Sequence, residues 1–487
     1  MPPTVALLLW LVLLLALLWF DPAKDSEASF ALWVPVIWMF ISTSRLPSQW
    51  LGSQMGQGVQ ALEEGNPLDR TIYSLLILLS IAILLSRSFR WRQFFASNFF
   101  LTAFLFFSLV SVVWSDFPFV AFKRWFRDLG NYLVILIVYS EVCPLEALRT
   151  FLRRLYYLLI PLSVLLVRYY PQIGKQYSVW TGAPEYIGVA TSKNTLGALC
   201  MLGGIFFFWD TVTRWSDRKK GRTRRIMLVN VAFIAMALWL LNKSDSATSR
   251  VCLVIGCLVI MVAYSKWGKC HSTFFRVLIP TSFLAYLVLA FGFGFSGALA
   301  QQLGRDPSLT GRTNIWEAVL STNTNPLLGT GYESFWLGPR LSQVWQAAGL
   351  PVNEAHNGYL EVYLDLGAIG LIVLVGVLIS SYRTICRSLT TLPSLASLSL
   401  ALWTIALFYN MTEAAFKPSF MCLTFLLGTV AVSRAAVVRG LPTSKPPLVK
   451  NSWRPEGSGI VISGAAKSHS HRLNRNEGRT TGLFRRG

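Results

Sequence analysis

Long apolar runs recur along most of this chain, and they constrain its fold more than any other feature. Of its 487 residues, 53% are hydrophobic and 14% are charged, whereas roughly a quarter of a soluble protein is charged. Many runs are long enough to cross ~30 Å of hydrocarbon as a helix. Helices satisfy their own backbone hydrogen bonds, as lipid-exposed backbone requires. The pattern therefore predicts an all-α, polytopic membrane protein.

The apolar runs predict about 12–13 transmembrane helices within a domain that covers residues 1–436. The run Thr4 to Phe20 has neither a charged n-region nor a small-residue cleavage site, and another span follows at once, so we interpret it as a span rather than a signal peptide. The predicted spans are 4–20, 29–43, 71–86, 98–114, 129–143, 154–168, 195–212, 226–242, 250–264, 276–295, 359–382, 394–410 and 419–436.

Basic residues are concentrated in two segments of the chain. Segment 213–226 has seven basic residues and one acidic residue, and the tail from Ser433 has eleven and two, within a net charge of +21. Beside spans, such stretches mark the cytoplasmic side and contact anionic membrane lipid, so we expect no nucleic-acid partner. The positive-inside rule then places the tail in the cytoplasm, where residues 437–487 are predicted to be disordered.

One long polar loop, residues 296–357, faces outward in this topology and carries His356. Its aromatic residues favour a folded loop. His356 is the only histidine that the topology places outside, and its near-neutral pKa suits acid–base chemistry or phosphate contact. The alternative is an ordinary surface or hydrogen-bonded histidine. Only Glu354 and Glu361 are near it in sequence and no second histidine lies outside, so we expect neither a metal nor another cofactor.

Cations gather where helices that run inward begin, although acidic side chains favour the positive end of a helix dipole. They are Lys123, Arg124, Arg127, Lys193, Arg250, His356 and Lys417. Stacked in this way they repel one another unless an anion lies among them, and arginines at helix N-termini suit a phosphate or pyrophosphate. Each could instead extend to lipid headgroups. Arg250, after a Ser/Thr-rich turn, and Arg312, in mid-loop, fit that alternative least.

The loop motifs occur in a fixed order. They are Gly311-Arg312-x3-Trp316, then Asn325-Pro326-Leu327-Leu328-Gly329-Thr330-Gly331, then His356-Asn357-x2-Leu360, then Gly367. Upstream stand Ser192-Lys193-Asn194 and Ser249-Arg250. This ordered set resembles the O-antigen ligase/polymerase family over roughly residues 100–435.

The resemblance implies an inner-membrane glycosyltransferase with a GT-C-like helical fold, one long periplasmic loop, and neither nucleotide sugar nor metal. The donor would be an undecaprenyl-diphosphate-linked glycan and the acceptor a glycan or lipid-linked sugar hydroxyl. Carried over by motif, Arg250 and Arg312 would hold the diphosphate, and His356 would be the catalytic or donor-contacting histidine. Lys123, Arg124 and Arg127 match the family's charged outer segment more loosely. Lys193 and Asn357 complete the predicted substrate-binding set.

Two rival functions stay open at this stage. A transporter or flippase of lipid-linked oligosaccharide would also need an anion site, but transporters tend to place charges near the midplane on broken helices in repeated halves. Here the charges lie at the predicted outer face beside one asymmetric loop. A sensor or scaffold that binds glycans is the other rival. The motifs do not distinguish a ligase from a polymerase, nor a proton-accepting His356 from one that binds diphosphate.

Overall fold

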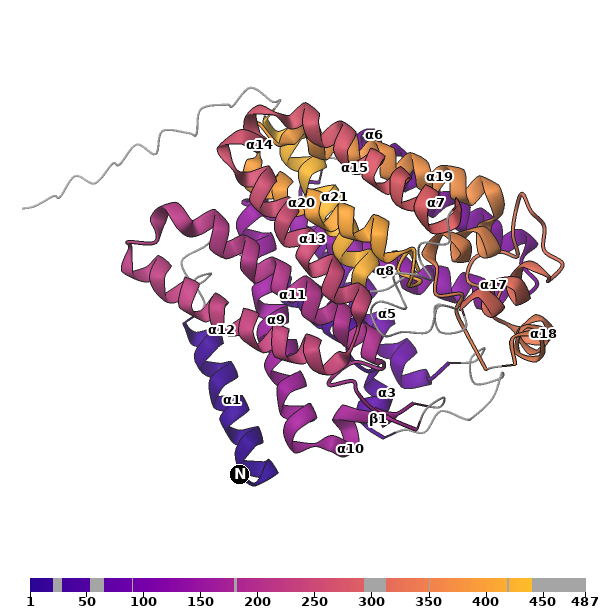
Figure 1. Ribbon diagram of the computed structural model, residues 1–487, viewed down its shortest axis with the longest axis horizontal. Helices are drawn as coiled ribbons and strands as arrows, with labels where there is room; N and C mark the ends of the chain where they lie inside the picture. The colour runs from indigo at the N-terminus through magenta and orange to yellow at the C-terminus, as the bar shows by residue number, and fades with distance from the viewer. Residues whose placement is uncertain are drawn as a thin grey trace, which may run out of the picture. The chain divides into compact units, whose positions relative to one another are not determined.

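Helices account for most of the described residues (Figure 1). The structure, a computed structural model, describes residues 1–20, 29–52, 65–89, 91–178, 182–292, 312–349, 351–417 and 420–439. The start of the long loop through Gly311 and the tail beyond residue 439 lie outside the described residues.

The first half of the chain forms helices and one small hairpin. Its elements are α1 (Pro3–Trp19), η2 (Phe30–Leu32), α2 (Trp33–Thr43), α3 (Pro47–Trp50), α5 (Pro67–Leu85), α6 (Trp91–Ser97), α7 (Phe99–Val110), η3 (Ser111–Trp114), α8 (Pro118–Ser140), α9 (Pro144–Tyr169), α10 (Pro171–Gly174), β1 (Lys175–Tyr177), β2 (Pro184–Tyr186), α11 (Lys193–Arg214), η4 (Trp215–Asp217) and α12 (Gly221–Ser244). Strands β1 and β2 pair antiparallel, with Lys175 opposite Tyr186, and apolar runs gave no signal for them.

The second half continues as helices. Its elements are α13 (Ala247–Tyr264), α14 (Lys266–Cys270), α15 (Ser272–Leu287), the π-helix η5 (Val288–Gly292), α17 (Arg312–Leu320), α18 (Gly338–Ala348), α19 (Gly358–Ser388), α20 (Pro393–Tyr409) and α21 (Phe420–Arg439).

The predicted all-α polytopic membrane fold is confirmed, and each predicted span overlaps a described helix. By length and composition, seven of the described helices can cross a membrane, or eight if the pair bent by 92° at α6 and α7 counts as one span. Four more apolar helices are shorter than 18 residues. Helix α8 begins at Pro118, about a turn and a half before Arg124, so its first half carries the cations that were expected to precede it.

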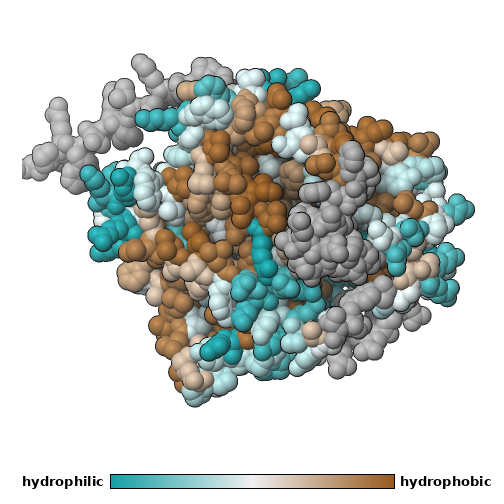
Figure 2. Space-filling model, in the orientation of Figure 1, coloured by the Kyte–Doolittle hydropathy of each residue, from teal (hydrophilic) through white to brown (hydrophobic). Residues whose placement is uncertain are grey.

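Exposed apolar side chains cover the helices where lipid would contact them. Leu258 of α13, Leu278 of α15 and Ile372 of α19 are examples among many. Figure 2 shows hydrophobic residues over the middle of the helices, with hydrophilic residues at the turn between α11 and α12 and around α17 and α18. A soluble protein would bury such side chains, so this surface agrees with a bilayer as the solvent.

The described part of the long loop is folded, with a small apolar core of its own. Helices α17 and α18 pack together. The buried members of this core are Ile315, Ala318, Val319, Phe335, Trp336, Leu341, Val344, Ala348, Val352, Ala355 and Leu364. Because Leu364 belongs to α19, the loop core is continuous with a membrane helix, and that contact fixes the loop over the bundle.

A glycine motif joins the loop to a break in α19. Gly367 interrupts that helix with a φ of 64°, and a Cβ there would lie 2.2 Å from the backbone carbon of Leu327. Across the break, Thr330 N donates to Leu364 O at 3.0 Å, and the N of Ala368 donates to the O of Pro326 at 2.9 Å. The Asn325–Gly331 motif thus provides hydrogen-bond partners for backbone groups that the broken helix leaves unpaired. This role of the motif is structural.

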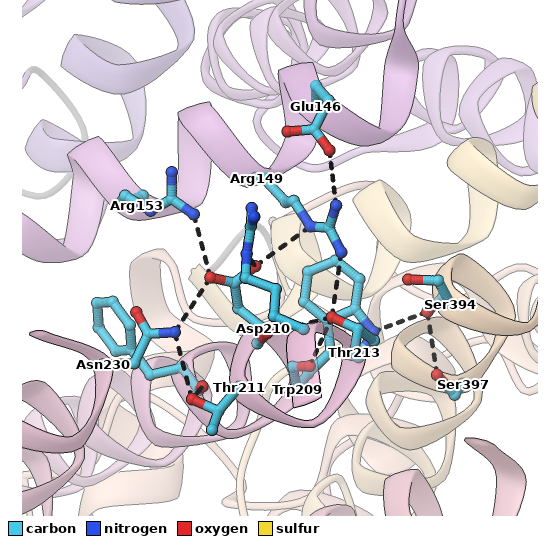
Figure 3. Close-up of polar contacts among 12 residues, drawn as sticks. Glu146, Arg149, Arg153, Trp209, Asp210, Thr211, Thr213, Asn230, Ser394 and Ser397 are labelled. Atoms are coloured by element: carbon cyan, nitrogen blue, oxygen red, sulfur yellow. Dashed lines mark hydrogen bonds and ion pairs between the residues drawn. The ribbon is translucent and has the colours of Figure 1, made fainter. Parts of the chain in front are cut away.

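A buried charge cluster ties α9, α11 and α12 together (Figure 3). Asp210 of α11 is fully buried, and its carboxylate lies 3.1 Å from Arg153 Nη2, 3.2 Å from Arg149 Nε and 2.8 Å from Arg214 Nε. Asn230 of α12 donates to the same carboxylate at 3.1 Å. Because each arginine is paired with the Asp210 carboxylate, its burial does not leave an uncompensated charge in the protein.

Candidate functional site

The site is organised by the N-terminus of α19. Asn357 is its N-cap, and its Oδ1 accepts hydrogen bonds from the backbone N of Tyr359 at 3.0 Å and of Leu360 at 3.1 Å. These bonds satisfy donors that a helix start otherwise leaves open. Asn357 is buried, so the structure gives this predicted substrate-binding residue a capping role. The helix start therefore fixes the residue directly before it, His356.

His356 has a left-handed backbone, with a φ of 50°. A residue with a Cβ rarely adopts this conformation, and it persists only where neighbours hold it in place. On one side stands the Asn357 cap. On the other, the Ala355 carbonyl accepts from Trp316 Nε1 at 2.8 Å, and the Ala355 N–H donates to the Glu361 carboxylate. The imidazole is therefore aimed by a tightly held backbone.

Two carboxylates face the same nitrogen of the His356 ring. Nδ1 lies 2.9 Å from Glu354 Oε1 and 3.6 Å from Glu413 Oε2. Burial alone would lower the pKa of His356, but the contacts with Glu354 and Glu413 outweigh it and raise that pKa to about 9. Burial likewise opposes ionisation of Glu354, but His356, Lys417 and Arg312 hold its pKa below the ordinary value. At neutral pH the ring is therefore an imidazolium between two carboxylates.

Glu413 joins residues from three distant segments. Its Oε1 accepts from Arg312 Nη2 at 3.0 Å and from Asn194 Nδ2 at 3.0 Å, while its Oε2 faces His356. The turn after α20 places it, since the Glu413 N donates to the Tyr409 carbonyl at 3.0 Å. The predicted pair His356 and Arg312 is thus brought together, with a shared carboxylate between them.

Among the described residues, Glu354, His356 and Glu413 also form a group whose ligand atoms lie within 4.8 Å of one another, as a metal site would need. One His and two carboxylates suit zinc in donor type. However, Arg312 and Asn194 already bond to one oxygen of Glu413, and the imidazolium lies against both carboxylates. The donor set therefore fits an internal ion network better than a divalent cation.

A cavity of about 560 Å³ reaches the same loop through Asn353, although the residues of the ion network do not line it. Phe119, Phe122, Phe126 and Ile77 give it apolar walls, and Asn353 joins it to the loop that ends at His356. Its charged lining residues are Asp69, Arg70, Lys123, Arg124, Arg127, Glu333 and Lys417. With five basic and two acidic side chains, the cavity favours an anion that carries a long apolar group.

The predicted cations of α8 line this cavity, and each also has a partner on the protein. Lys123 Nζ lies 5.0 Å from the centre of the Phe119 ring. Arg124 Nη1 donates to the Glu333 carbonyl, and Arg127 Nε lies 3.1 Å from Asp128 Oδ1. Lys417, which also lines the cavity, pairs with Glu361 at 2.9 Å.

Two further predicted cations, Arg250 and Lys193, neither pair with a residue of the ion network nor line the cavity. Arg250 pairs with Asp245 at 2.7 Å, and its side chain is 41% exposed. The same first turn of α13 still reaches the site, because Thr248 Oγ1 lies 3.0 Å from Thr412 Oγ1, next to Glu413. Lys193 pairs with Glu185 at 2.7 Å, and its neighbour Asn194 is the residue that contacts Glu413.

Sequence reasoning missed Glu413, Asn194 and Glu361 as parts of the site. Asn194 lay inside a motif that had been noted, and Glu361 lies five residues after His356, in the first turn of α19. Glu413 had no such signal, because the packing of α20 beside α19, where the Gly358 N donates to the Asn410 carbonyl at 2.8 Å, brings it to the loop. Lys417 was noted among the outward cations but was not assigned to the site.

Two comparisons with known proteins found similar sequences. Residues 186–375 match the O-antigen ligase family. The chain is also similar to the exopolysaccharide production protein ExoQ of Rhizobium meliloti (strain 1021), with 27% identity over 311 residues. That alignment covers 59% of this chain and 65% of the relative, so less than two thirds of the relative's length is matched. The family match includes Arg250, Arg312 and His356 and ends before Glu413.

Proposed function

Because residues 186–375 match the O-antigen ligase family, we propose that this membrane protein transfers a glycan from an undecaprenyl-diphosphate-linked donor to a sugar hydroxyl. The reaction takes place at the outer face of the bacterial inner membrane. The observation that carries the proposal is the ion network of Arg312, His356 and Glu413, with a cavity of apolar and basic walls that reaches the same loop.

The cavity suits the donor in two respects. Its phenylalanine wall accepts polyprenyl chain, because apolar burial favours the lipid there. Its basic wall, which includes Arg124, Arg127 and Lys417, favours the two phosphates by charge. Asn353 belongs both to the cavity lining and to the loop of His356, and we therefore place the sugar end of a bound donor toward that loop.

The transfer step follows from the chemistry of the donor. The oxygen of the acceptor hydroxyl forms a bond to the anomeric carbon, and the bond from that carbon to the diphosphate oxygen breaks. The electron pair leaves with the diphosphate, so negative charge grows there in the transition state. Cations placed near that oxygen stabilise the transition state more than the ground state, and this is the role that we assign to Arg312 and His356.

His356 is better suited to bind the leaving diphosphate than to take the proton of the acceptor. Its pKa of about 9 makes it an imidazolium at neutral pH, with Nδ1 turned to the carboxylates. A protonated ring donates to phosphate oxygen and cannot accept a proton. Glu354, whose side chain is 36% exposed, is then the carboxylate that receives the acceptor's proton.

Arg250 remains in the proposed site as a second diphosphate contact. Its present partner, Asp245, is 71% exposed, and an exposed ion pair holds a side chain only weakly. Diphosphate carries more negative charge than one carboxylate, so the guanidinium would exchange its partner when the donor binds. The acceptor is either a lipid A core or a protein, as for a ligase, or another lipid-linked repeat unit, as for a polymerase.

Purified protein in proteoliposomes tests the reaction class. The substrates are polyprenyl-diphosphate glycan and either a lipid A core acceptor or a second lipid-linked glycan, without nucleotide. We expect a new glycosidic bond and free polyprenyl diphosphate, with equal rates in EDTA and in added Mg²⁺ or Zn²⁺. Movement of the donor between leaflets without a new bond would establish a flippase instead. Loss of transfer in EDTA, restored by a divalent ion, would overturn the metal-free network at Glu354, His356 and Glu413.

A further inference from the structure

Glu361 is a buried carboxylate in the first turn of α19, and it has three donors. Its side chain is 1% exposed. Oε2 accepts from Lys417 Nζ at 2.9 Å and from Trp336 Nε1 at 2.9 Å, and Oε1 accepts from the Ala355 backbone N. The two oxygens of a carboxylate can take all three donors, whereas an amide can offer only one accepting oxygen.

The third of these bonds acts on His356. Ala355 is fully buried, and its peptide is held on both sides, by Glu361 at the N–H and by Trp316 at the carbonyl. The next residue is His356, with its left-handed φ of 50°. A strained backbone relaxes when one of the contacts that hold it is removed.

The first of these bonds reaches the large cavity. Lys417 lines that cavity, and its Nζ also lies 5.7 Å from the centre of the Trp336 ring. One carboxylate thus contacts both a cation of the cavity wall and the backbone that carries the imidazole.

We infer that Glu361 is a positioning residue, which holds His356 in its left-handed conformation and links the ring to the cation that Lys417 presents to the cavity. The inference rests on the proposed function, since it assigns the cavity to the donor. Glu361 itself touches neither donor nor acceptor. It acts through the Ala355 peptide and through Lys417.

The charged groups around the His356 ring make this role measurable. Glu354 precedes it in the loop, Glu413 faces it from the turn after α20, Arg312 shares Glu413 from α17, and Lys417 acts on Glu354 through its charge. When the ring turns away from Glu354 and Glu413, the two contacts that raise its pKa are lost. The titration of His356 therefore reports its position.

The test is Glu361→Gln, studied by His356 titration and by transfer kinetics. NMR of labelled histidine follows the ring, and His356→Ala identifies its signal. We expect the midpoint to fall from about 9 toward the ordinary 6.5. We also expect kcat to fall about tenfold or more with the KM for donor within about threefold, because misplacement of a reacting group costs rate rather than binding.

Two further variants separate positioning from folding. Asp365→Asn changes another buried carboxylate on the same helix, one that accepts from the Phe335 backbone N at 3.2 Å, and we expect its His356 midpoint to stay at the wild-type value. Lys417→Arg keeps a cation beside Glu361, and we expect it to keep that midpoint too. An unchanged midpoint in folded Glu361→Gln would overturn the inference.

The titration needs no enzymatic activity. If the wild-type protein fails to transfer glycan but the midpoint falls in Glu361→Gln, the proposed function fails while the positioning of His356 stands. If transfer proceeds and the midpoint does not move, the inference alone fails.

Discussion

Arg312 donates from Nη2 to Oε1 of Glu413 at 3.0 Å, although 101 residues separate the two in sequence. The same carboxylate faces His356 with its other oxygen. Glu413 therefore keeps two cations close together that would repel each other without it. A bound diphosphate would take over part of that role, because its oxygens are acceptors of the same kind.

Glu413→Gln removes the charge and keeps the shape. We expect the pKa of His356 to fall, since one of its two carboxylate neighbours becomes neutral. We expect transfer to slow by about tenfold or more because the cations lose their fixed spacing. Histidine NMR and the transfer rate check both effects. Glu317→Gln, an exposed glutamate on α17, is the matched control, and equal loss in both variants would contradict the account.

The pH dependence of transfer follows from the raised pKa of His356. If the protonated ring contacts the leaving diphosphate, activity falls as pH rises through about 9. If the ring were the base, activity would rise over the same range. The protonated ring also stabilises the fold, fully below the ordinary pKa of 6.5, and this contribution is lost as pH rises through about 9. The transfer rate and the thermal unfolding midpoint are each measured from pH 6 to 10 for wild type and His356→Ala. In the wild type, both should fall as pH rises through about 9.

Asn357→Ala tests the helix cap that holds the His356 loop. We expect a loss of about 1 kcal/mol in unfolding free energy and a fall in transfer beyond that explained by unfolding, because the neighbouring left-handed residue loses its support. Ser265→Ala removes the cap of α14, where Ser265 Oγ accepts from the Gly268 N at 3.0 Å. That variant should lose stability and keep activity per folded molecule. Matching activity losses in both would refute a specific role for Asn357.

Asp210→Asn tests the charge cluster of α9, α11 and α12. It leaves three arginines around a neutral side chain, and removal of one partner from a buried pair costs about 3–5 kcal/mol. Asp217→Asn makes the same change in the exposed pair with Lys220, where the aspartate is 58% exposed, and should cost about 1 kcal/mol or less. Thermal unfolding in detergent compares the two. Equal midpoints would show that the cluster adds little to stability.

The membrane fold could be predicted from sequence because lipid imposes one local rule, that apolar runs form helices. The same rule predicted that His356 and Arg312 lie in one loop between two spans, and therefore on the same side of the membrane. It could not place Glu413, since a single glutamate between two spans gives no pattern, and only helix packing brings it to the loop. The sequence pattern also could not show that Arg250 forms an ion pair with Asp245. Gly329 and Gly367 were part of the family resemblance. In the structure, they allow the loop backbone and α19 to approach closely at the break in that helix.

Single-turnover transfer by His356→Ala and Arg312→Ala tests the central claim most directly. Each variant is reconstituted with polyprenyl-diphosphate glycan and acceptor, and new glycosidic bond is measured against wild type. Arg340→Ala, which removes a loop arginine paired with Asp116 at 2.6 Å, is the matched control. The account predicts losses of about a hundredfold in the two site variants, as for other groups that stabilise a developing anion, and near wild-type rates in the control. Full transfer by His356→Ala and Arg312→Ala would contradict it.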